Sequence, residues 1–542
     1  MIKKGVYKMN RLDKKYDFVF KSLKIIDGTG APAFYGDIGI KNDNIIDIGK
    51  ISGQALQEYD CSGLVAAPGF IDIHNHSDFS IFQEPAARNF TSQGVTTLVT
   101  GNCGISGGPL TSKNKEIFES EQIDSIQDKL SHWSRFSDFA LDLEKLKKSV
   151  NIAPLVGHGN IRGAVMGMEN EKASTEQMNQ MKQLLRESME GGCFGMSTGL
   201  IYDPGIHSDT EELIELTRIV AEYNGIYATH MRNESDFLID SVIEAITIAR
   251  RSGVRTQISH LKTSGKRNFG LDQTVLQLME YYRRFEVEIT CDTYPCIFGN
   301  TGLENCFPLW TRTKGMVHFL NILKQKDNRE KIKYELSRPS IGWENILLDA
   351  GFDKTIISSS QKFKEYEGKS INKLSFILKK DPFDTIFYLV ANDPFIAVLV
   401  GGLGKEDMEY VLQHPLSMIC SDAQATKKSQ EMCHPRNYRA FTKVLSKYVR
   451  EDHALTLEEA IRKMTSFPAW KLGLDDRGLI KPGFKADLAI FDLWNVKYKS
   501  EYGNPHHYSE GMVYVLTNGK IVIDNGEFTD KVSGGKLLKK LN

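Results

Sequence analysis

The chain has 542 residues, enough for two to four domains at about 150 residues per domain. Hydrophobic residues make up 41% of it and charged residues 25%, and the 68 Lys and Arg nearly balance the 69 Asp and Glu. This composition is typical of a soluble globular protein and argues against nucleic acid bound through bulk charge. No run of about 18 apolar residues occurs, and no apolar segment follows the charged N-terminal residues. Neither a membrane span nor a secretory signal is therefore expected, which favours the cytoplasm.

Both ends of the chain are rich in strand signals. Short apolar runs separated by Gly and Asn-Asp turns fill residues 18–51. Near the C-terminus, ADLAIFD is followed by MVYVLTNGKIVIDNG with its Asn-Gly turns, a pattern typical of β-hairpins. Two β-rich ends around an alternating middle predict one small β-sandwich domain built from residues 1–66 and 480–542.

The middle of the chain, residues 67–479, alternates strand-like and helix-like segments, which is typical of parallel βαβ units. The strand candidates are short apolar runs, as buried parallel strands should be; they are Phe70–His76, Val95–Asn102, Ile152–His158, Cys193–Thr198, Ile226–Met231, Arg255–Leu261, Val287–Thr293 and Leu416–Ser421. Helical patterns between them include Glu176–Glu190, Thr210–Tyr223, Phe237–Arg251 and Leu271–Phe285. These units predict an α/β fold, a (β/α)₈ TIM-type barrel.

The interval between the seventh and eighth strand candidates is too long for one helical crossover. The seventh ends near Tyr294 and the eighth begins near Leu416. We therefore expect an inserted subdomain at residues 299–392, with Lys-rich helical stretches such as Asp327–Leu336. Insertions at this end of a barrel usually form a lid or a wall of the substrate site.

The eight cysteines are scattered singly along the chain. No CxxC pair occurs, so neither a structural zinc knuckle nor a thioredoxin-like redox site is indicated. In a reducing compartment they are expected to be free thiols. A cysteine that matters chemically should therefore act alone, as a metal ligand or a nucleophile.

The strongest local signal is the segment PGFIDIHNH, which ends in His74 and His76. Two histidines at i and i+2 on a strand point to the same face. At the end of a barrel strand that face is the barrel mouth, where both imidazoles can share one metal. Alone, such a pair is weak evidence, because surface histidine pairs are common.

Further polar residues stand at the ends of other strand candidates. Cys103 follows the second, His230 and His260 end the fifth and sixth, and Asp422 ends the eighth. Thiolate, imidazole and carboxylate are the usual ligands of zinc, and barrel active sites are built at this end of the strands. Each residue taken singly could be a satisfied polar residue of the core, but their joint placement is hard to explain in that way.

These motifs resemble the amidohydrolase superfamily and, within it, the D-aminoacylase (N-acyl-D-amino-acid deacylase) family. The resemblance covers nearly the whole chain through PGFIDIHNHSD, GVTTLVTGNCG, GHGNIR, GMSTGLIYDPG, THMRNE, ISHLKTSG, CDTYPC, SDA and HPRNYR. The cysteine after GVTTLVTGN is among the more specific features. The fourth strand candidate, GMSTG, has no lysine at its end, unlike relatives whose bridging metal ligand is a carboxylated lysine.

The resemblance implies a tightly held Zn²⁺ on Cys103, His230 and His260. It implies a second, weaker metal position on His74 and His76, with the cysteine able to bridge the two. Zinc lowers the pKa of bound water toward about 7 and polarises a carbonyl.

The resemblance also implies that Asp422 acts as general base and then as general acid. Arg436, Lys262 and Tyr294 would contact the substrate carboxylate and carbonyl. His158, in GHGNIR, is a further candidate for the mouth of the site, or it only orients a neighbouring loop. Glu234 would hold Arg232 or a ligand histidine.

The function expected from the resemblance is hydrolysis of N-acyl-D-amino acids to a carboxylate and a free D-amino acid. Small-molecule substrates are the only partners expected, and the oligomeric state stays open. One alternative is a cyclic-amide hydrolase of the dihydroorotase or hydantoinase kind, against which the missing lysine and the presence of Cys103 both argue. The other is a catalytically silent metal-bound scaffold, against which the complete set of ligands and the base argue.

Overall fold

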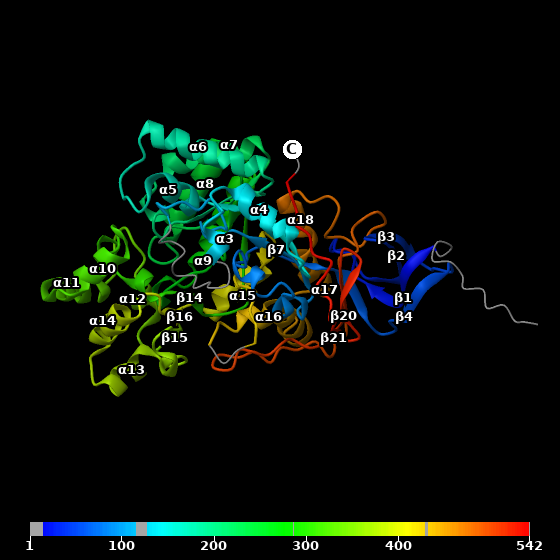
Figure 1. Ribbon diagram of the computed structural model, residues 1–542. Helices are drawn as coiled ribbons and strands as arrows, with labels where there is room; N and C mark the ends of the chain where they lie inside the picture. The colour runs from blue at the N-terminus through cyan, green and yellow to red at the C-terminus, as the bar shows by residue number, and fades with distance from the viewer. Residues whose placement is uncertain (1–14, 115–126, 286, 429–431, 541–542) are drawn as a thin grey trace, which may run out of the picture.

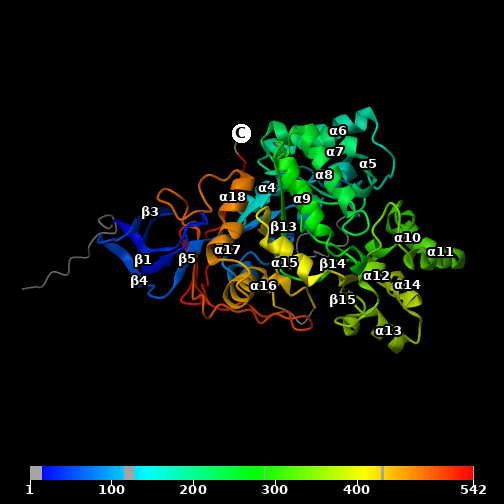
Figure 2. The ribbon, with the colours of Figure 1, turned by 180° about the vertical axis from the view of Figure 1, so that it is seen from behind.

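The computed structural model describes residues 15–114, 127–285, 287–428 and 432–540. Its parts follow one another in space (Figure 1, and from behind in Figure 2). A β-domain with strands β1 to β4 lies at one end, and a barrel of strands and helices occupies the middle. A mostly helical subdomain, which contains α10 to α14, lies at the opposite end.

The barrel strands are β6 (Phe70–Asp72), β7 (Val95–Thr100), β8 (Asn151–Pro154), β9 (Val156–Gly157), β10 (Gly195–Gly199), β11 (Ile226–His230), β12 (Arg255–Ile258), β13 (Ile289–Thr293) and β17 (Ser417–Ile419). They pair in parallel, in the orders β6-β7-β8 and β17-β13-β12-β11-β10-β9. β8 runs on into β9 through Leu155, and a parallel bridge between Asn75 and Ala423 joins the edges of β6 and β17. These parallel strands, joined at their edges, are the arrangement expected of a TIM-type barrel.

Four predicted helices are confirmed with nearly the expected bounds; they are α6 (Thr175–Glu190), α7 (Thr210–Glu222), α8 (Leu238–Ser252) and α9 (Leu271–Arg283). Ser174 caps α6 by accepting the N–H of Gln177, and Gly253, with φ 75°, ends α8. The other helices of this part are α1 (Arg88–Thr91), α3 (Gln127–Leu130), α4 (Phe136–Lys145), α5 (His158–Met166), α15 (Lys405–Gln413), α16 (Arg436–Lys443), α17 (Leu457–Met464) and α18 (Ser466–Leu472). A π-helical stretch, Val444–Glu451, continues α16.

The β-domain draws its strands from both ends of the chain. They are β1 (Tyr16–Ile25), β2 (Phe34–Lys41), β3 (Asn44–Gly49), β4 (Ala55–Asp60), β5 (Val65–Pro68), β18 (Leu488–Phe491), β19 (Met512–Thr517), β20 (Lys520–Asp524) and β21 (Glu527–Phe528). β5 pairs with β18, so the strands form one nine-stranded sheet instead of the two sheets of the predicted sandwich. Stacked rings of Phe20 and Tyr59, with Tyr514 beside them, give both chain ends a common core.

The insertion between β13 and β17 has its own antiparallel sheet and hydrophobic core. Its elements are β14 (Gly299–Gly302), α10 (Gly315–Leu323), α11 (Lys326–Leu336), α12 (Ile346–Ala350), β15 (Thr355–Ser359), α13 (Ile371–Leu378), α14 (Pro382–Asn392) and β16 (Ala397–Val400). α11 confirms the predicted Lys-rich helix. The central strand of the sheet, β16, lies beyond residue 392, so the subdomain is longer than predicted. Its pairing with β14 is a long-range contact that no local pattern reveals.

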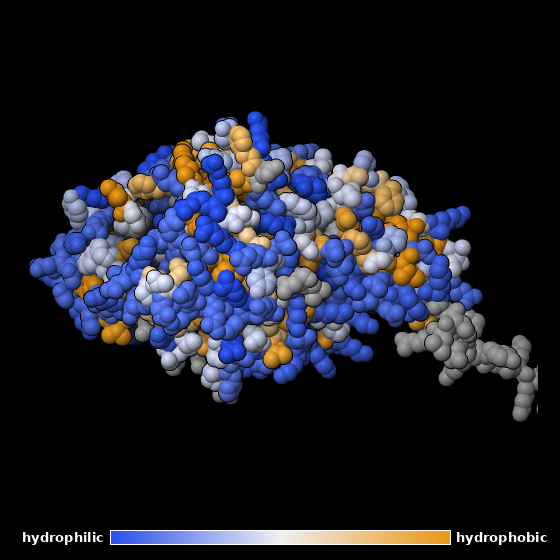
Figure 3. Space-filling model, turned by 90° about the horizontal axis from the view of Figure 1, so that it is seen from above, coloured by the Kyte–Doolittle hydropathy of each residue, from blue (hydrophilic) through white to orange (hydrophobic). Residues whose placement is uncertain are grey.

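No helix in the described ranges is both long and apolar enough to cross a lipid bilayer. On the face shown in Figure 3, hydrophobic residues are scattered among hydrophilic ones.

A buried carboxyl pair joins the first turns of α9 and α15. Asp272 is fully buried, and its neighbour Asp407 accepts the N–H of Gly270. Burial and the nearby Asp407 raise the pKa of Asp272 to about 7. The folded chain therefore holds this proton much more tightly than the unfolded chain does.

We expect Asp272→Asn to stabilise the protein at pH 8. The unfolded Asp272 loses its proton near pH 4 and the folded one near pH 7, so the wild type loses stability as the pH rises across this window. An amide never ionises and can donate to Asp407. The unfolding midpoint should rise by a few °C at pH 8 and by less at pH 5. Unfolding midpoints of Asp272→Asn equal to or below those of wild type at both pH values would contradict the raised pKa of Asp272 in the folded chain.

Candidate active site

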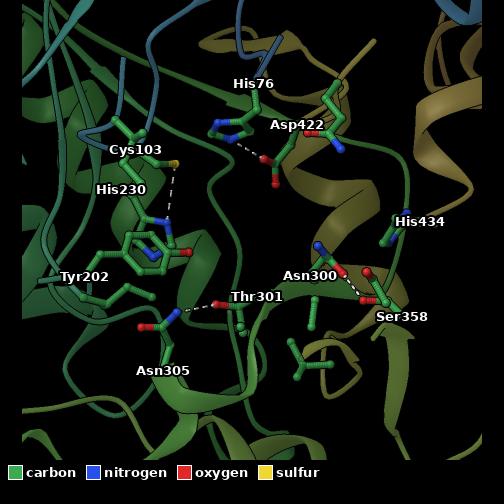
Figure 4. Close-up of a pocket in the computed structure, with 18 of the residues that line it drawn as sticks. His76, Cys103, Tyr202, His230, Asn300, Thr301, Asn305, Ser358, Asp422 and His434 are labelled. Carbon is green, nitrogen blue, oxygen red and sulfur yellow. Dashed lines mark hydrogen bonds and ion pairs between the residues drawn. The ribbon is translucent and has the colours of Figure 1, made fainter. Parts of the chain in front are cut away.

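The strand ends place the predicted chemical residues around one cavity of about 690 Å³. The cavity lies at the carboxyl ends of the parallel strands, where barrel enzymes bind their substrates. His74 and His76 follow β6, and Cys103 follows β7. His230 is the last residue of β11, while His260 and Asp422 lie just beyond β12 and β17. Figure 4 shows His76, Cys103, His230 and Asp422 on one side of the cavity.

Cys103 is the centre of this group. Its Sγ lies 3.4 Å from Nε2 of His74, 3.4 Å from Nε2 of His260 and 3.8 Å from Nδ1 of His230. All four side chains are buried. The structure thus brings together residues that lie far apart in the sequence, as predicted.

Asp422 faces the same group from the other side. Its Oδ1 lies 3.1 Å from Nε2 of His76, which is itself 3.3 Å from Nε2 of His74. Its Oδ2 forms an ion pair with Nη1 of Arg436 at 2.7 Å. Burial acts to raise the pKa of the Asp422 carboxyl, but the Arg436 guanidinium holds it well below its usual range. The carboxylate is therefore ionised.

The backbone is strained at three of these residues. Cys103, His260 and Asp422 have φ values of 52°, 37° and 50°, in the left-handed region that side-chain-bearing residues rarely adopt. Such conformations cluster at functional sites, where the surrounding structure enforces them. Gly199 helps here, because a Cβ on it would lie 2.2 Å from the Cys103 carbonyl oxygen.

Glu234 holds a histidine of the group from behind. Its Oε1 lies 3.0 Å from Nδ1 of His260, and its two oxygens accept bonds of 2.7 and 2.8 Å from Nζ of Lys262. Of the two predicted partners, the structure selects the histidine, because Arg232 binds Glu244 instead. A carboxylate on Nδ1 directs Nε2 toward Cys103.

The donor set fits a metal ion. Burial lowers the pKa of His74, His230 and His260 well below the usual imidazole value, so each ring is neutral and offers a lone pair. Burial also raises the pKa of the Cys103 thiol, so a thiolate at this depth requires a cation beside it. Among the described residues, three groups have ligand atoms close enough to share an ion: His74, Cys103 and His260; His74, His76 and Asp422; and His230, Glu234 and His260.

The three residues predicted to contact the substrate all line the cavity. The Arg436 guanidinium lies over the Tyr294 ring, 4.7 Å from its centre. Its Nε and Nη1 make no aligned hydrogen bond within the described residues, and neither does the Tyr294 hydroxyl. Lys262 also lines the cavity, but its ammonium is already bound to Glu234.

His158 does not join the group. It is fully buried outside the cavity lining, and its Nε2 lies 2.8 Å from Oε1 of Glu212. Glu212 also forms a buried ion pair with Arg162. His158 is the first residue of α5, directly after β9, and its ring binds Glu212 instead of lining the cavity. The prediction that it contacts substrate is therefore not supported.

Several lining residues were not predicted from the sequence. The insertion forms the cavity wall opposite Cys103 and the histidines, with Thr301, Asn305 and Ser358 (Figure 4). Tyr202 places its ring 5.1 Å from that of His230. Of these residues only Tyr202 could have been predicted from the sequence, because it closely follows the strand end GMSTG. The insertion residues come from loops and short strands without any motif.

The fold and this site together define a barrel enzyme with a candidate metal centre. A family model described as "Amidohydrolase family" matches residues 57–240 and 432–523. The D-aminoacylase of Alcaligenes xylosoxydans xylosoxydans is 32% identical over 526 residues, which cover 97% of this chain and 98% of that protein. The chain belongs to the amidohydrolase family, in the branch of the D-aminoacylases.

Solved structures agree with this assignment. N-acyl-D-glutamate deacylase from Bordetella bronchiseptica, complexed with zinc and a phosphonate mimic of the tetrahedral intermediate, superposes with a TM-score of 0.81. It is 28% identical, and the match covers 97% of this chain and all of that one. A D-hydantoinase, 14% identical with a TM-score of 0.54 over 97% of this chain and all of its own, shares the fold alone.

We expect His158→Ala to weaken the fold and not the chemistry. Loss of the buried ring and its bond to Glu212 should cost about 2–4 kcal/mol of unfolding free energy. The kcat/KM of the folded enzyme on an N-acyl-D-amino acid should stay within about threefold of wild type. Denaturant unfolding and steady-state kinetics measure the two effects. A tenfold rise in KM with unchanged stability would restore His158 to the substrate site.

Proposed function

We propose that the protein hydrolyses the amide bond of N-acyl-D-amino acids, with zinc as cofactor, to a carboxylate and a free D-amino acid. The observation that carries this proposal is the group of Cys103, four histidines and Asp422 beside one cavity, which all of them except the fully buried His74 line, in a chain that matches D-aminoacylases along its whole length. The cavity is of the size that binds small molecules.

The tight zinc site would consist of Cys103, His230 and His260. A tetrahedral zinc holds sulfur and nitrogen ligands about 3.5 Å apart, and the observed separations from Sγ are 3.4 and 3.8 Å. His74 and His76 would form the weaker position, with Cys103 between the two. When bound, zinc would polarise the scissile carbonyl and lower the pKa of water.

Asp422 would move the proton. Its carboxylate is ionised and faces the histidine group, so it can accept a proton from the attacking water. As the carbon–nitrogen bond breaks, the same carboxyl can return that proton to the leaving nitrogen. The chain itself then forms no covalent intermediate.

Arg436 and Tyr294 would hold the substrate carboxylate. The guanidinium is buried, lies beside the candidate metal centre and keeps Nε without a hydrogen bond among the described residues. Lys262 would assist mainly through its charge, because Glu234 already binds its ammonium. With carbonyl and carboxylate both fixed, the pocket wall admits the side chain of one hand only.

The insertion would act as the lid or substrate wall. Its Thr301, Asn305 and Ser358 face the candidate metal centre across the cavity (Figure 4). This wall would select the acyl group or the amino-acid side chain, since the barrel strands supply the chemical groups on the other side.

The experiment that tests the function is a hydrolysis screen on zinc-loaded protein. N-acetyl and N-formyl amino acids of both hands serve as substrates, together with hydantoin and dihydroorotate for the cyclic-amide alternative. Release of a free D-amino acid supports the proposal. Cleavage of cyclic amides alone, or of nothing, refutes it.

The first prediction from the proposed function concerns Cys103. Purified protein should hold at least one zinc per chain, and Cys103→Ala should lower zinc content and activity together, because the shared ligand is lost. Elemental analysis and activity assays measure both. Cys193→Ala, at a buried cysteine elsewhere in the barrel, is the matched control and should keep its zinc. Full zinc content in Cys103→Ala would remove this residue from the ligand set.

The second concerns Asp422. Asp422→Asn should keep zinc and fold but lose about two to four orders of magnitude in kcat, the range of a general acid–base group. The amide has the same size but cannot accept the proton. Zinc content and circular dichroism confirm that the variant is intact. Near-normal turnover would mean that another group moves the proton.

The third concerns Arg436. A charge-assisted bond is worth about 1.5–3 kcal/mol, so Arg436→Ala should lower kcat/KM by about ten- to a hundredfold on an N-acetyl-D-amino acid. The carboxyl amide of the same substrate does not use this bond and should lose much less. Both substrates experience the loss of the Asp422 partner equally, so their ratio isolates the carboxylate contact. Equal losses would make Arg436 a structural residue.

A further inference from the structure

The loop after β11 contacts α12 and the residues just before it in the insertion. Nδ2 of Asn233 lies 3.5 Å from the Trp343 carbonyl oxygen. Arg267 bridges the two parts, with Asp236 at 2.6 Å and Asp349 at 2.8 Å. The insertion is thus docked on the same loop that carries Glu234.

One contact in this interface reaches the residue that orients the candidate metal centre. Oε2 of Glu344 accepts the backbone N–H of Glu234 at 2.7 Å. Glu344 is 7% exposed and Glu234 is 2% exposed, so water cannot easily replace this bond. On the other side, the N–H of Ser264 donates to the Glu234 carbonyl at 2.7 Å.

These two bonds fix the Glu234 backbone from both directions. Ser264 belongs to the barrel, whereas Glu344 belongs to the insertion. The Glu234 carboxylate then reaches His260 and Lys262. A displacement of the Glu234 backbone would therefore turn the His260 ring away from Cys103.

We propose that Glu344 is a positioning residue of the metal centre: the insertion, through this one side chain, holds Glu234 where it orients His260. The inference rests on the proposed function only in taking the bound metal to be zinc. It gives the insertion a second role besides that of a substrate wall.

The chemistry of Glu344 suits this role. Burial, together with Glu234 and Asp349, raises the pKa of its carboxyl to about 8. At neutral pH the uncharged group accepts the N–H without placing a second negative charge beside Glu234. A glutamine has the same shape, and its amide oxygen can accept the same N–H, so it should replace Glu344 well.

Other contacts keep the insertion docked when Glu344 is changed. The bridge from Arg267 to Asp236 and Asp349 does not involve it. A suitable control is Asp393, another buried insertion carboxylate that accepts backbone N–H groups, from Gln361 at 2.8 Å and Lys362 at 3.2 Å. Unlike Glu344, which lines the cavity, Asp393 lies outside the cavity lining.

The experiment compares E344A, E344Q and D393A with wild type, all as full-length zinc-loaded protein. E344M keeps the bulk without the acceptor and is measured in parallel, because alanine leaves a void at this buried position. The main readouts are the rate of zinc release to a chelator and the absorption spectrum of the Co²⁺-substituted protein. The kcat and KM on an N-acetyl-D-amino acid are measured as well.

We expect E344A and E344M to release zinc about tenfold faster or more, as for other partners of metal ligands. The cobalt spectrum should change, and kcat should fall more than KM rises. E344Q should stay within about threefold of wild type, and D393A should match wild type in zinc release.

Three results would overturn the proposal. Unchanged zinc release and cobalt spectra in E344A and E344M would show that Glu344 does not position the centre. Equal effects in E344Q and E344A would exclude the role as hydrogen-bond acceptor. Equal effects in D393A would mean that any loosening of the insertion suffices. If wild type hydrolyses no N-acyl-D-amino acid, the proposed function fails. The rates of zinc release and the cobalt spectra still decide whether Glu344 positions the centre.

Discussion

The whole site depends on the burial of one thiol among imidazoles. Cys103 is buried and has three ring nitrogens within 3.8 Å of its sulfur, an arrangement that favours the thiolate only beside a cation. The left-handed backbone at Cys103, His260 and Asp422 is the cost of aiming side chains from separate strand ends at one point. Each of the three residues lies within three residues of the end of a barrel strand, and the strand holds its conformation in place.

The insertion completes this arrangement from outside the barrel. It supplies one wall of the cavity and also contacts the loop that carries Glu234. In the proposed function, this one subdomain would therefore act both on the binding of substrate and on the geometry of the centre. A change in the packing of α12 would then alter both the cavity wall and the position of Glu234.

Much of this could be predicted from the sequence, since short apolar strands and capped helices are local patterns. The residues after β6, β7, β11, β12 and β17 were also predictable, because parallel strands end at one edge. The pairing of β16 with β14, the Arg436–Asp422 ion pair and the contact of Glu344 with Glu234 were not. Each joins residues that are distant in sequence and follow no spacing rule. The contact of His158 with Glu212 instead of the cavity was not predictable either, because GHGNIR does not show which way the ring points.

The position of β18 in the β-domain has a consequence for how the chain is made. β18 lies between β5 and β19, so one edge of β5 lacks its neighbour until the ribosome has passed residue 491. The edge of β6 likewise has no partner until the segment after β17 has been synthesised. A nascent chain thus carries two open sheet edges through most of its synthesis, and such edges invite pairing with other chains. Stalled or truncated products should accordingly be the forms of this protein that aggregate or attract chaperones.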